Sequence, residues 1–179
     1  MQLIGITGKK CSGKDTVADF LVRKYGFTKL SFALPLKTAA QELFLLTPQQ
    51  LHDRKEKEAI DPRWGVSPRQ IMQMIGTDWV RHQFRDDFWV RRIQYEIERL
   101  PSHVQKIVVS DVRFENEKQW ILDMGGQVIG LSRKHINLSD QHESETAIDA
   151  CLKNISVFDN DGPVQELYKK IEIWMQTPV

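Results

Sequence analysis

Residues 8–16 read Gly-Lys-Lys-Cys-Ser-Gly-Lys-Asp-Thr, which places a lysine directly after the second glycine of a Gly-x-x-x-x-Gly-Lys spacing. Glycines allow a backbone turn whose N–H groups point at phosphate oxygens, and the N-terminus of a following helix adds positive charge. Lys14 would reach the β- and γ-phosphates of a nucleoside triphosphate. A plain glycine-rich turn does not require a lysine at this position. The motif therefore predicts a P-loop, with phosphate and metal contacts from Gly8, Lys10, Ser12, Gly13, Lys14, Asp15 and Thr16.

The residue after the P-loop lysine departs from the common pattern, in which Ser or Thr binds Mg²⁺ at this position. Here Asp15 follows Lys14, and Thr16 comes next. Asp15 could hold Mg²⁺ directly or through water, because Mg²⁺ favours carboxylates and keeps several waters. It could equally be a favourable negative charge in the first turn of a helix. Both interpretations stay open, as does the choice between Asp15 and Thr16 as the metal ligand.

A second candidate carboxylate, Asp111, follows the apolar run 106–110, which is the best buried strand in the chain. The carboxyl edge of an open α/β sheet is where ligands bind, and a P-loop lies at that same edge. Asp111 could orient Mg²⁺ or accept a proton from an acceptor molecule. The alternative is a cap for the segment that follows. We expect Asp111 in the site.

Short apolar runs alternate with longer amphipathic segments along the chain, which predicts an α/β fold with a mostly parallel sheet of about five strands. The predicted strands are 2–7, 27–32, 106–110, 127–131 and 154–158. The predicted helices begin at Lys14, Pro35, Pro48, Pro68, about Asp87, after Asp111, and after Pro163. The helix from Pro48 should extend to about Ala59, and the helix from Pro68 toward Phe84, while 133–145 reads as polar and irregular.

The composition narrows the class of protein. With 179 residues, 41% of them hydrophobic and 27% charged, the chain fits one globular domain. A net charge of +1 is not the excess of positive charge that is typical of proteins binding a nucleic-acid polymer. No apolar run approaches the roughly 20 residues that span a membrane, and the N-terminus does not read as a signal peptide. Only Cys11 and Cys151 are cysteines, too few for a disulfide framework, so we expect a cytoplasmic protein.

With these residues in place, the chain resembles the phage-type deoxynucleoside monophosphate kinases over nearly its whole length. It resembles the animal-type phosphomevalonate kinases more distantly. The shared features are the unusual Gly-Lys-Asp ending of the P-loop and the segments 31–37, 110–117, 142–145 and 155–162. The pattern Arg-x-x-x-Gln-x-x-Gly-Thr-Asp-x-x-Arg over 69–81 resembles the deoxynucleotide kinases and matches the phosphomevalonate kinases less well. The region between Phe44 and Pro68 is shorter than in the phage enzymes, so base recognition could differ.

The resemblance implies one domain over residues 1–179 with a three-layer P-loop kinase fold, a helical acceptor-binding region at about 47–100 and a lid at about 133–146. It implies an ATP- and Mg²⁺-dependent kinase that converts a deoxynucleoside monophosphate and ATP into the diphosphate and ADP. Lys14, Asp111 and Arg133 would serve catalysis, and Asp15 and Asp111 the metal. Asn160 and Gly162 would contact the ATP base. The acceptor would be bound by Lys37, Arg69, Asp78, Arg81, Trp89, Arg113, His142 and Glu145.

Each of these residues also has an ordinary structural interpretation. Arg69 and Arg81 could be surface arginines, although guanidinium suits bidentate phosphate binding. Trp89 in an amphipathic helix is more often core than a base-stacking platform. His142 and Glu145 could simply build the lid, and Arg133 could be a solvated lid residue.

Two other functions stay open at this point. One is a kinase for a non-nucleotide phosphate such as phosphomevalonate, which would show no dependence on a base. The other is a non-catalytic nucleotide-binding module, which would not need a second cluster of anion-binding residues. The expected partners are small nucleotides rather than a nucleic-acid polymer or a membrane, and a homodimer stays open.

Overall fold

The computed structural model describes residues 1–134 and 141–177. The chain forms two compact units, of which unit 1 comprises Met1–Ser31 with Ile93–Val179 and unit 2 comprises Phe32–Arg92. The helix α6 (Phe88–Glu98) carries the chain from unit 2 back into unit 1. The P-loop motif lies in unit 1, and the pattern over 69–81 lies in unit 2.

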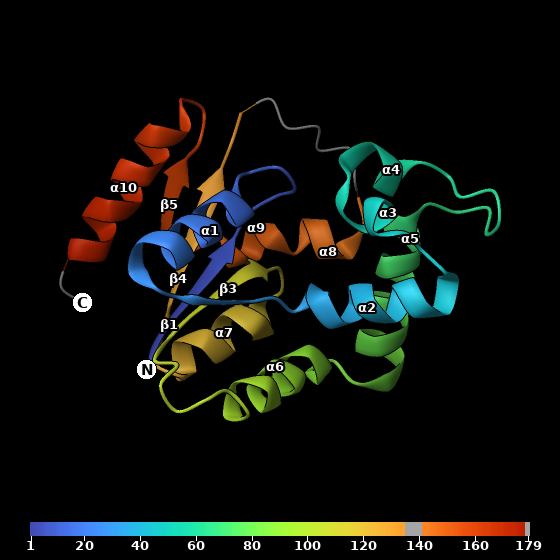
Figure 1. The fold of residues 1–179 in the computed structure, drawn as a ribbon, viewed down its shortest axis with the longest axis horizontal. Coiled ribbons are helices and arrows are strands. Elements are labelled where there is room, and N and C mark those ends of the chain that lie inside the picture. The colour runs from blue at the N-terminus through green and yellow to red at the C-terminus, as the bar shows by residue number, and fades with distance from the viewer. Residues whose placement is uncertain (135–140, 178–179) are drawn as a thin grey trace. The chain divides into compact units, whose positions relative to one another are not determined.

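Unit 1 contains a five-stranded sheet in the order β2-β3-β1-β4-β5, in which every neighbouring pair is parallel (Figure 1). The strands are β1 (Gln2–Thr7), β2 (Thr28–Leu30), β3 (Lys106–Val112), β4 (Gln127–Ser132) and β5 (Ser156–Asp159). All five predicted strands are present. Because β3 extends to Val112, Asp111 lies inside the strand rather than just past its end. Thr7 at the end of β1 pairs with Val112, so the P-loop and Asp111 share one sheet edge.

Helices cover both faces of this sheet because β1 and β3 are apolar on both sides, as central parallel strands are. On one face α1 (Lys14–Tyr25) and α10 (Val164–Gln176) build a core with the sheet. Its buried members include Ile4, Ile6, Val17, Leu21, Val108, Ile129, Leu167 and Ile171. On the other face α7 (Glu115–Asp123) packs so closely that a Cβ on Gly5 would lie 2.5 Å from Ile121 Cδ1. The unit is therefore three layers deep, as expected.

Unit 2 is helical and has its own small core of Ala40, Leu46, Leu51, Ile71 and Met72. Its elements are α2 (Ala33–Phe44), α3 (Pro48–His52), α4 (Arg54–Glu58), α5 (Pro68–Gln73), the π-helix η1 (Met74–Phe84) and the start of α6. Thr47 and Ser67 each begin a helix through a capping box, as their positions before a proline predict.

Several boundaries differ from the sequence-based prediction. The helix expected over 47–59 is divided at Asp53, whose carboxylate accepts hydrogen bonds from the amides of Lys55 and Glu56 and so starts a new helix. The helix expected from Pro68 to Phe84 changes from α to π at Met74. The segment 133–145 was expected to be irregular, but α8 (Glu143–Thr146) begins within it and α9 (Ile148–Cys151) follows. Residues 135–140 lie outside the described part.

A buried carboxylate joins the loop after α4 to the rest of unit 2. Asp61 accepts hydrogen bonds from Arg63 Nε at 2.9 Å, Arg63 Nη2 at 2.6 Å and Gln50 Nε2 at 2.8 Å. Arg63 Nη1 also donates to the Leu45 carbonyl at 3.2 Å. The Arg63 guanidinium holds the pKa of the Asp61 carboxyl well below its usual range. This ion pair therefore stabilises unit 2 above the ordinary carboxyl pKa of about 4 and loses that effect as the pH falls.

We predict that Asp61→Asn lowers the melting temperature at neutral pH, because it removes the charge that Arg63 binds. The difference from the wild type should start to shrink as the pH falls below about 4, because the unfolded chain binds a proton at Asp61 there, and it should vanish only below the lowered pKa of the folded carboxyl. Thermal unfolding followed by circular dichroism across this range measures both effects. Asp123→Asn, which changes an exposed carboxylate on α7, is the control and should show neither. Equal melting temperatures for Asp61→Asn and wild type at neutral pH would contradict the assignment.

Candidate active site

The P-loop backbone adopts a shape that its glycines make possible. Gly8 has φ 147° and Gly13 has φ 105°. A Cβ on Gly8 would lie 2.5 Å from the Leu131 carbonyl oxygen, and one on Gly13 would lie 2.4 Å from Asn160 Nδ2. A side chain at either position would strain the backbone and force neighbours apart. This narrow loop, followed directly by the N-terminus of α1, has the geometry that binds a polyphosphate through main-chain N–H groups.

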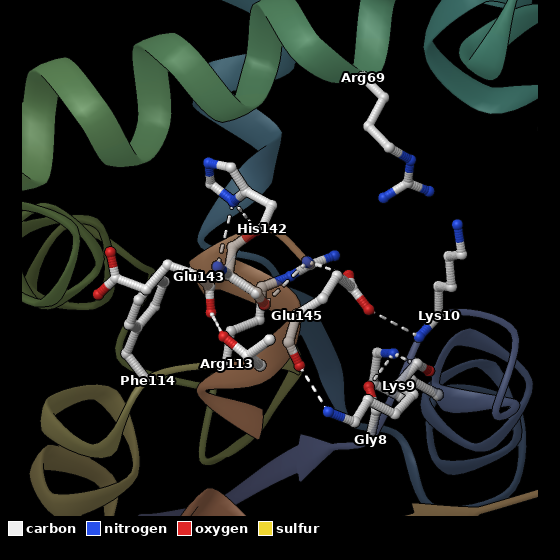
Figure 2. A network of polar contacts seen from close by, with 12 residues as sticks. Gly8, Lys9, Lys10, Arg69, Arg113, Phe114, His142, Glu143 and Glu145 are labelled. Atoms are coloured by element: carbon white, nitrogen blue, oxygen red, sulfur yellow. Dashed lines mark hydrogen bonds and ion pairs between the residues drawn. The ribbon is translucent and has the colours of Figure 1, made fainter. Parts of the chain in front are cut away.

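The loop is anchored from two sides. Asn160, in the connection from β5 to α10, donates from Nδ2 to the Ser12 carbonyl at 2.9 Å. On the other side, the Glu145 carboxylate of α8 accepts a hydrogen bond from the Lys10 amide at 3.2 Å (Figure 2). Lys9 Nζ donates to the Glu145 carbonyl at 2.7 Å and pairs with Asp149 of α9 at 2.8 Å. Residues far apart in the sequence therefore hold the loop in its shape.

The Lys14 ammonium lies within the curl of the loop. Its Nζ donates to the carbonyls of Gly8 at 2.5 Å and Lys9 at 2.9 Å. Burial, and next the Arg113 guanidinium, lower the pKa of Lys14 to about 8, against the opposing effect of Glu145, Asp111 and Asp15. The P-loop lysine thus has a second cation and three carboxylates close enough to act on it. Thr16 is half-buried in the first turn of α1.

The predicted D-x-R segment reaches the same place. Asp111 accepts a hydrogen bond from Ser31 Oγ at 2.8 Å, which fixes its carboxylate at the sheet edge. Arg113 donates from Nη1 to Glu145 at 2.5 Å and to the Ser144 carbonyl at 3.3 Å, while its amide donates to Glu117 at 2.8 Å. Asp111 and Arg113 are thus fixed near the P-loop, and both charges influence the pKa of Lys14.

The second predicted metal ligand, Asp15, is exposed and pairs with Lys29 of β2 at 2.8 Å. Lys29 also pairs with Asp19 at 2.9 Å. Within 1–134 and 141–177 no three His, Cys, Asp or Glu side chains gather into a protein-only metal site. Mg²⁺ is usually held by one or two carboxylates together with phosphate oxygens and water, so a Mg²⁺ site does not require such a cluster. A role of Asp15 and Asp111 as its ligands stays a prediction.

The described part of the predicted lid is structured. His142 accepts a hydrogen bond at Nδ1 from the Ser144 amide at 3.2 Å, so its side chain caps α8 (Figure 2). Glu145 is buried, with 3% of its surface exposed. Arg133 is exposed directly after β4, and the next residue, Lys134, is tied to Asp161 by its amide at 2.6 Å. The middle of the lid, 135–140, lies outside the described residues.

Two of the predicted acceptor-binding arginines lie in unit 2. Arg69 on α5 pairs with Glu58 of α4 at 2.7 Å. Arg81 on η1 is buried and donates from Nη1 to the Asp86 carbonyl at 2.8 Å. Neither is a simple surface arginine, because each is held by a specific partner.

The other residues predicted to contact nucleotides differ in how far they are buried. Trp89 is 8% exposed and its indole N–H donates to the Gly76 carbonyl at 2.8 Å, so it contributes to packing in unit 2. Asp78 is exposed on η1, and Lys37 is half-buried on α2. Gly162 lies in the exposed loop before α10. Contacts of these residues with nucleotides stay predictions.

Sequence reasoning missed two charged residues that act on the P-loop. Lys29 lies in a short strand, and its pairing with Asp15 depends on β2 lying next to β3 rather than on any local pattern. Lys9 was a variable position of the motif, yet its ammonium joins the loop to α8 and α9. Neither pairing leaves a spacing signal in the sequence.

Comparison with known proteins identifies the group to which this arrangement belongs. The family model described as "Deoxynucleotide monophosphate kinase" matches residues 2–55 and 47–171. The chain belongs to the deoxynucleotide monophosphate kinase family. A provisionally named member from Acanthamoeba polyphaga mimivirus is 36% identical over 189 residues, covering 96% of this chain and 94% of that protein. The deoxynucleotide monophosphate kinase of Enterobacteria phage T4 is 26% identical, covering 96% and 98%.

Family membership confirms the resemblance inferred from the Gly-Lys-Asp ending and the pattern over 69–81. The fold prediction is also confirmed. The solved structure of dephospho-CoA kinase from Campylobacter jejuni has a TM-score of 0.55 at 15% identity, over 98% of this chain and 96% of that one. Among the helices that the structure describes, none is long and apolar enough to cross a membrane.

We predict that Gly8→Ala weakens ATP binding about ten- to a hundredfold, because a Cβ at this φ would strain the loop by about 1–3 kcal/mol. Cys11→Gly is the matched control, since Cys11 is an exposed residue of the same loop whose φ of 63° glycine adopts easily. That variant should bind ATP and turn over normally. Isothermal titration calorimetry measures the affinities. Equal ATP affinity in Gly8→Ala and wild type would show that the loop does not need this backbone shape.

Proposed function

We propose that this protein transfers the γ-phosphoryl group of ATP to a deoxynucleoside monophosphate, giving ADP and the deoxynucleoside diphosphate. The observation that carries the proposal is the clustering of Lys14, Arg113 and Asp111 at the mouth of a P-loop, in a chain of the deoxynucleotide monophosphate kinase family. A module that only bound nucleotide would not need a second cation beside the P-loop lysine.

For the donor, we propose that the main-chain N–H groups of residues 8–16 and the Lys14 ammonium bind the phosphates of ATP. Asn160 supports this role indirectly through the Ser12 carbonyl, and Gly162 lies two residues beyond it in the loop expected to lie against the adenine. A bound Mg²⁺ would supply positive charge that offsets the charge of the donor phosphates. Asp15 and Asp111 are the carboxylates that would hold it, and Lys29 orients Asp15.

For the acceptor, we propose that the arginines of unit 2, Arg69 and Arg81, bind its phosphate bidentately. Lys37 would add a further charge, while Asp78, Trp89 and His142 would contact the nucleoside. Arg69 is already held by Glu58, so part of its conformational freedom is lost before a ligand binds.

The transfer itself needs no covalent enzyme intermediate. An oxygen of the acceptor phosphate attacks the γ-phosphorus in line, and the bond from that phosphorus to the ADP oxygen breaks. We propose that Lys14 and Arg113 stabilise negative charge on the transferred group, with Arg133 from the predicted lid as a third cation. Both proposed substrates are small nucleotides, and we also propose that the enzyme is cytoplasmic.

An assay of ADP release with ATP and Mg²⁺ tests the acceptor class. The panel consists of dGMP, dTMP, dCMP and dAMP, their ribose counterparts, and phosphomevalonate. We expect turnover with at least one deoxynucleotide, at an ADP release rate well above that without acceptor. Turnover with phosphomevalonate alone would replace the proposed acceptor, whereas ATP binding without turnover on any acceptor would favour the nucleotide-binding module.

We predict that Lys14→Ala lowers kcat by about 10²–10³-fold, because it removes a preorganised charge that acts on the transferred group. The melting temperature should stay close to that of the wild type, since the lysine is bonded only to loop carbonyls. Steady-state kinetics and thermal unfolding measure the two effects. Near-normal turnover by this variant would remove the P-loop lysine from the mechanism.

We predict that Arg69→Ala raises the KM for the acceptor about ten- to a hundredfold, because a charged hydrogen bond contributes about 1.5–3 kcal/mol. The KM for ATP should change little. Arg54→Ala, which removes an exposed arginine of the neighbouring helix α4, is the control and should match the wild type. An unchanged acceptor KM would return Arg69 to a structural role as the partner of Glu58.

A further inference from the structure

We propose that Glu145 is a positioning residue, whose buried carboxylate fixes the Arg113 guanidinium beside the P-loop by binding Arg113 and the Lys10 amide at once. This inference rests on the proposed kinase function and deepens it. It assigns Glu145 a role in preparing the site for the transferred phosphoryl group, in place of the direct acceptor contact that the sequence indicated.

Both oxygens of the Glu145 carboxylate are engaged (Figure 2). Oε1 accepts from Arg113 Nη1 at 2.5 Å, and Oε2 accepts from the Lys10 amide at 3.2 Å. The side chain is only 4% exposed, against 27% for Arg113. A carboxylate this buried needs its cation and its hydrogen bonds, so the three groups form one connected unit. Displacing Glu145 would therefore disturb Arg113 and the P-loop together.

The main chain around Glu145 is also fixed by hydrogen bonds. Lys9 Nζ donates to the Glu145 carbonyl at 2.7 Å, and Arg113 Nη1 donates to the neighbouring Ser144 carbonyl at 3.3 Å. The His142 side chain caps the helix that carries both residues. The P-loop and the D-x-R segment thus each contact α8 twice, once at the Glu145 carboxylate and once at a backbone carbonyl.

The charges explain why a carboxylate is needed here. Arg113 and Lys14 both place positive charge beside the P-loop, since Glu145 joins Arg113 to the Lys10 amide and Lys14 Nζ donates to the Gly8 and Lys9 carbonyls. Two cations that act on one phosphoryl group repel each other before the nucleotide arrives. The Glu145 carboxylate offsets that repulsion and fixes the direction of the planar guanidinium. Its negative charge makes it a poor direct ligand for the acceptor phosphate.

The experiment compares the full-length wild type with Glu145→Gln, which keeps the size of the side chain and removes its charge. We expect kcat to fall about 10- to 100-fold, because a displaced guanidinium no longer matches the transferred group. The KM for the best acceptor should stay within about twofold of the wild type, as for an interaction made mainly in the transition state. Glu143→Gln, an exposed carboxylate on the same helix, is the matched control and should retain wild-type kcat.

A second readout needs no turnover. In the nucleotide-free protein, amide hydrogen exchange over residues 9–11 should be faster in Glu145→Gln than in wild type and in Glu143→Gln. Glu145→Asp serves as a second variant: it keeps the charge, so it should fold even where Glu145→Gln does not. Its shorter side chain cannot reach Arg113 and the Lys10 amide together, so exchange should be faster and kcat lower there too.

A double-mutant cycle separates positioning from an independent effect. If Glu145 acts through Arg113, Glu145→Gln should cause little further loss of kcat in an Arg113→Ala background. The inference would be overturned if the losses of kcat in the double-mutant cycle were additive. It would also be overturned if both Glu145 variants kept wild-type kcat and wild-type amide exchange, or if they raised the acceptor KM at unchanged kcat. The comparisons of kcat and KM require that the wild-type protein is active with at least one acceptor. A wild type inactive on every acceptor would instead contradict the proposed function.

Discussion

The structure of the site depends on balancing positive charge at the mouth of the P-loop. In the proposed mechanism Lys14 and Arg113 both act on the transferred phosphoryl group, and two neighbouring cations repel each other. Glu145, Asp111 and Asp15 offset that repulsion, and Glu145 also bonds to the loop itself. In the proposed mechanism this charge balance limits the reorganisation needed during transfer.

The fold makes this balance possible through the order of its strands. Because β1 lies between β3 and β4, the P-loop after β1 is flanked by the D-x-R segment on one side and the segment leading to the predicted lid on the other. The α8 helix then returns to contact both the P-loop and Arg113, while Asn160 reaches the loop from beyond β5. Each contact comes from a different part of the sequence, so the sheet must form for the site to exist.

Local signals predicted much of this arrangement. The apolar runs predicted the five strands, and the caps before two prolines predicted two helix starts. The P-loop spacing predicted the loop expected to bind phosphate, together with its lysine. Signals that depend on tertiary contacts were not accessible. The bond between Arg113 and Glu145 joins residues 32 positions apart, and the pairing of Lys29 with Asp15 requires the strand order. The division of a helix at Asp53 and the change to π geometry at Met74 are both compatible with the same polar and apolar pattern, so periodicity could not distinguish them from continuous α-helix.

The most direct test of the account follows the phosphoryl group itself. ATP carrying ¹⁸O at the γ-phosphate is incubated with Mg²⁺, the enzyme and its best deoxynucleoside monophosphate, and the products are analysed by mass spectrometry. Direct in-line transfer predicts that the labelled phosphoryl group appears as the β-phosphate of the deoxynucleoside diphosphate, with its non-bridging oxygens retained. Label found only in inorganic phosphate, with no labelled diphosphate, would contradict the central claim that this P-loop serves phosphoryl transfer to a nucleotide.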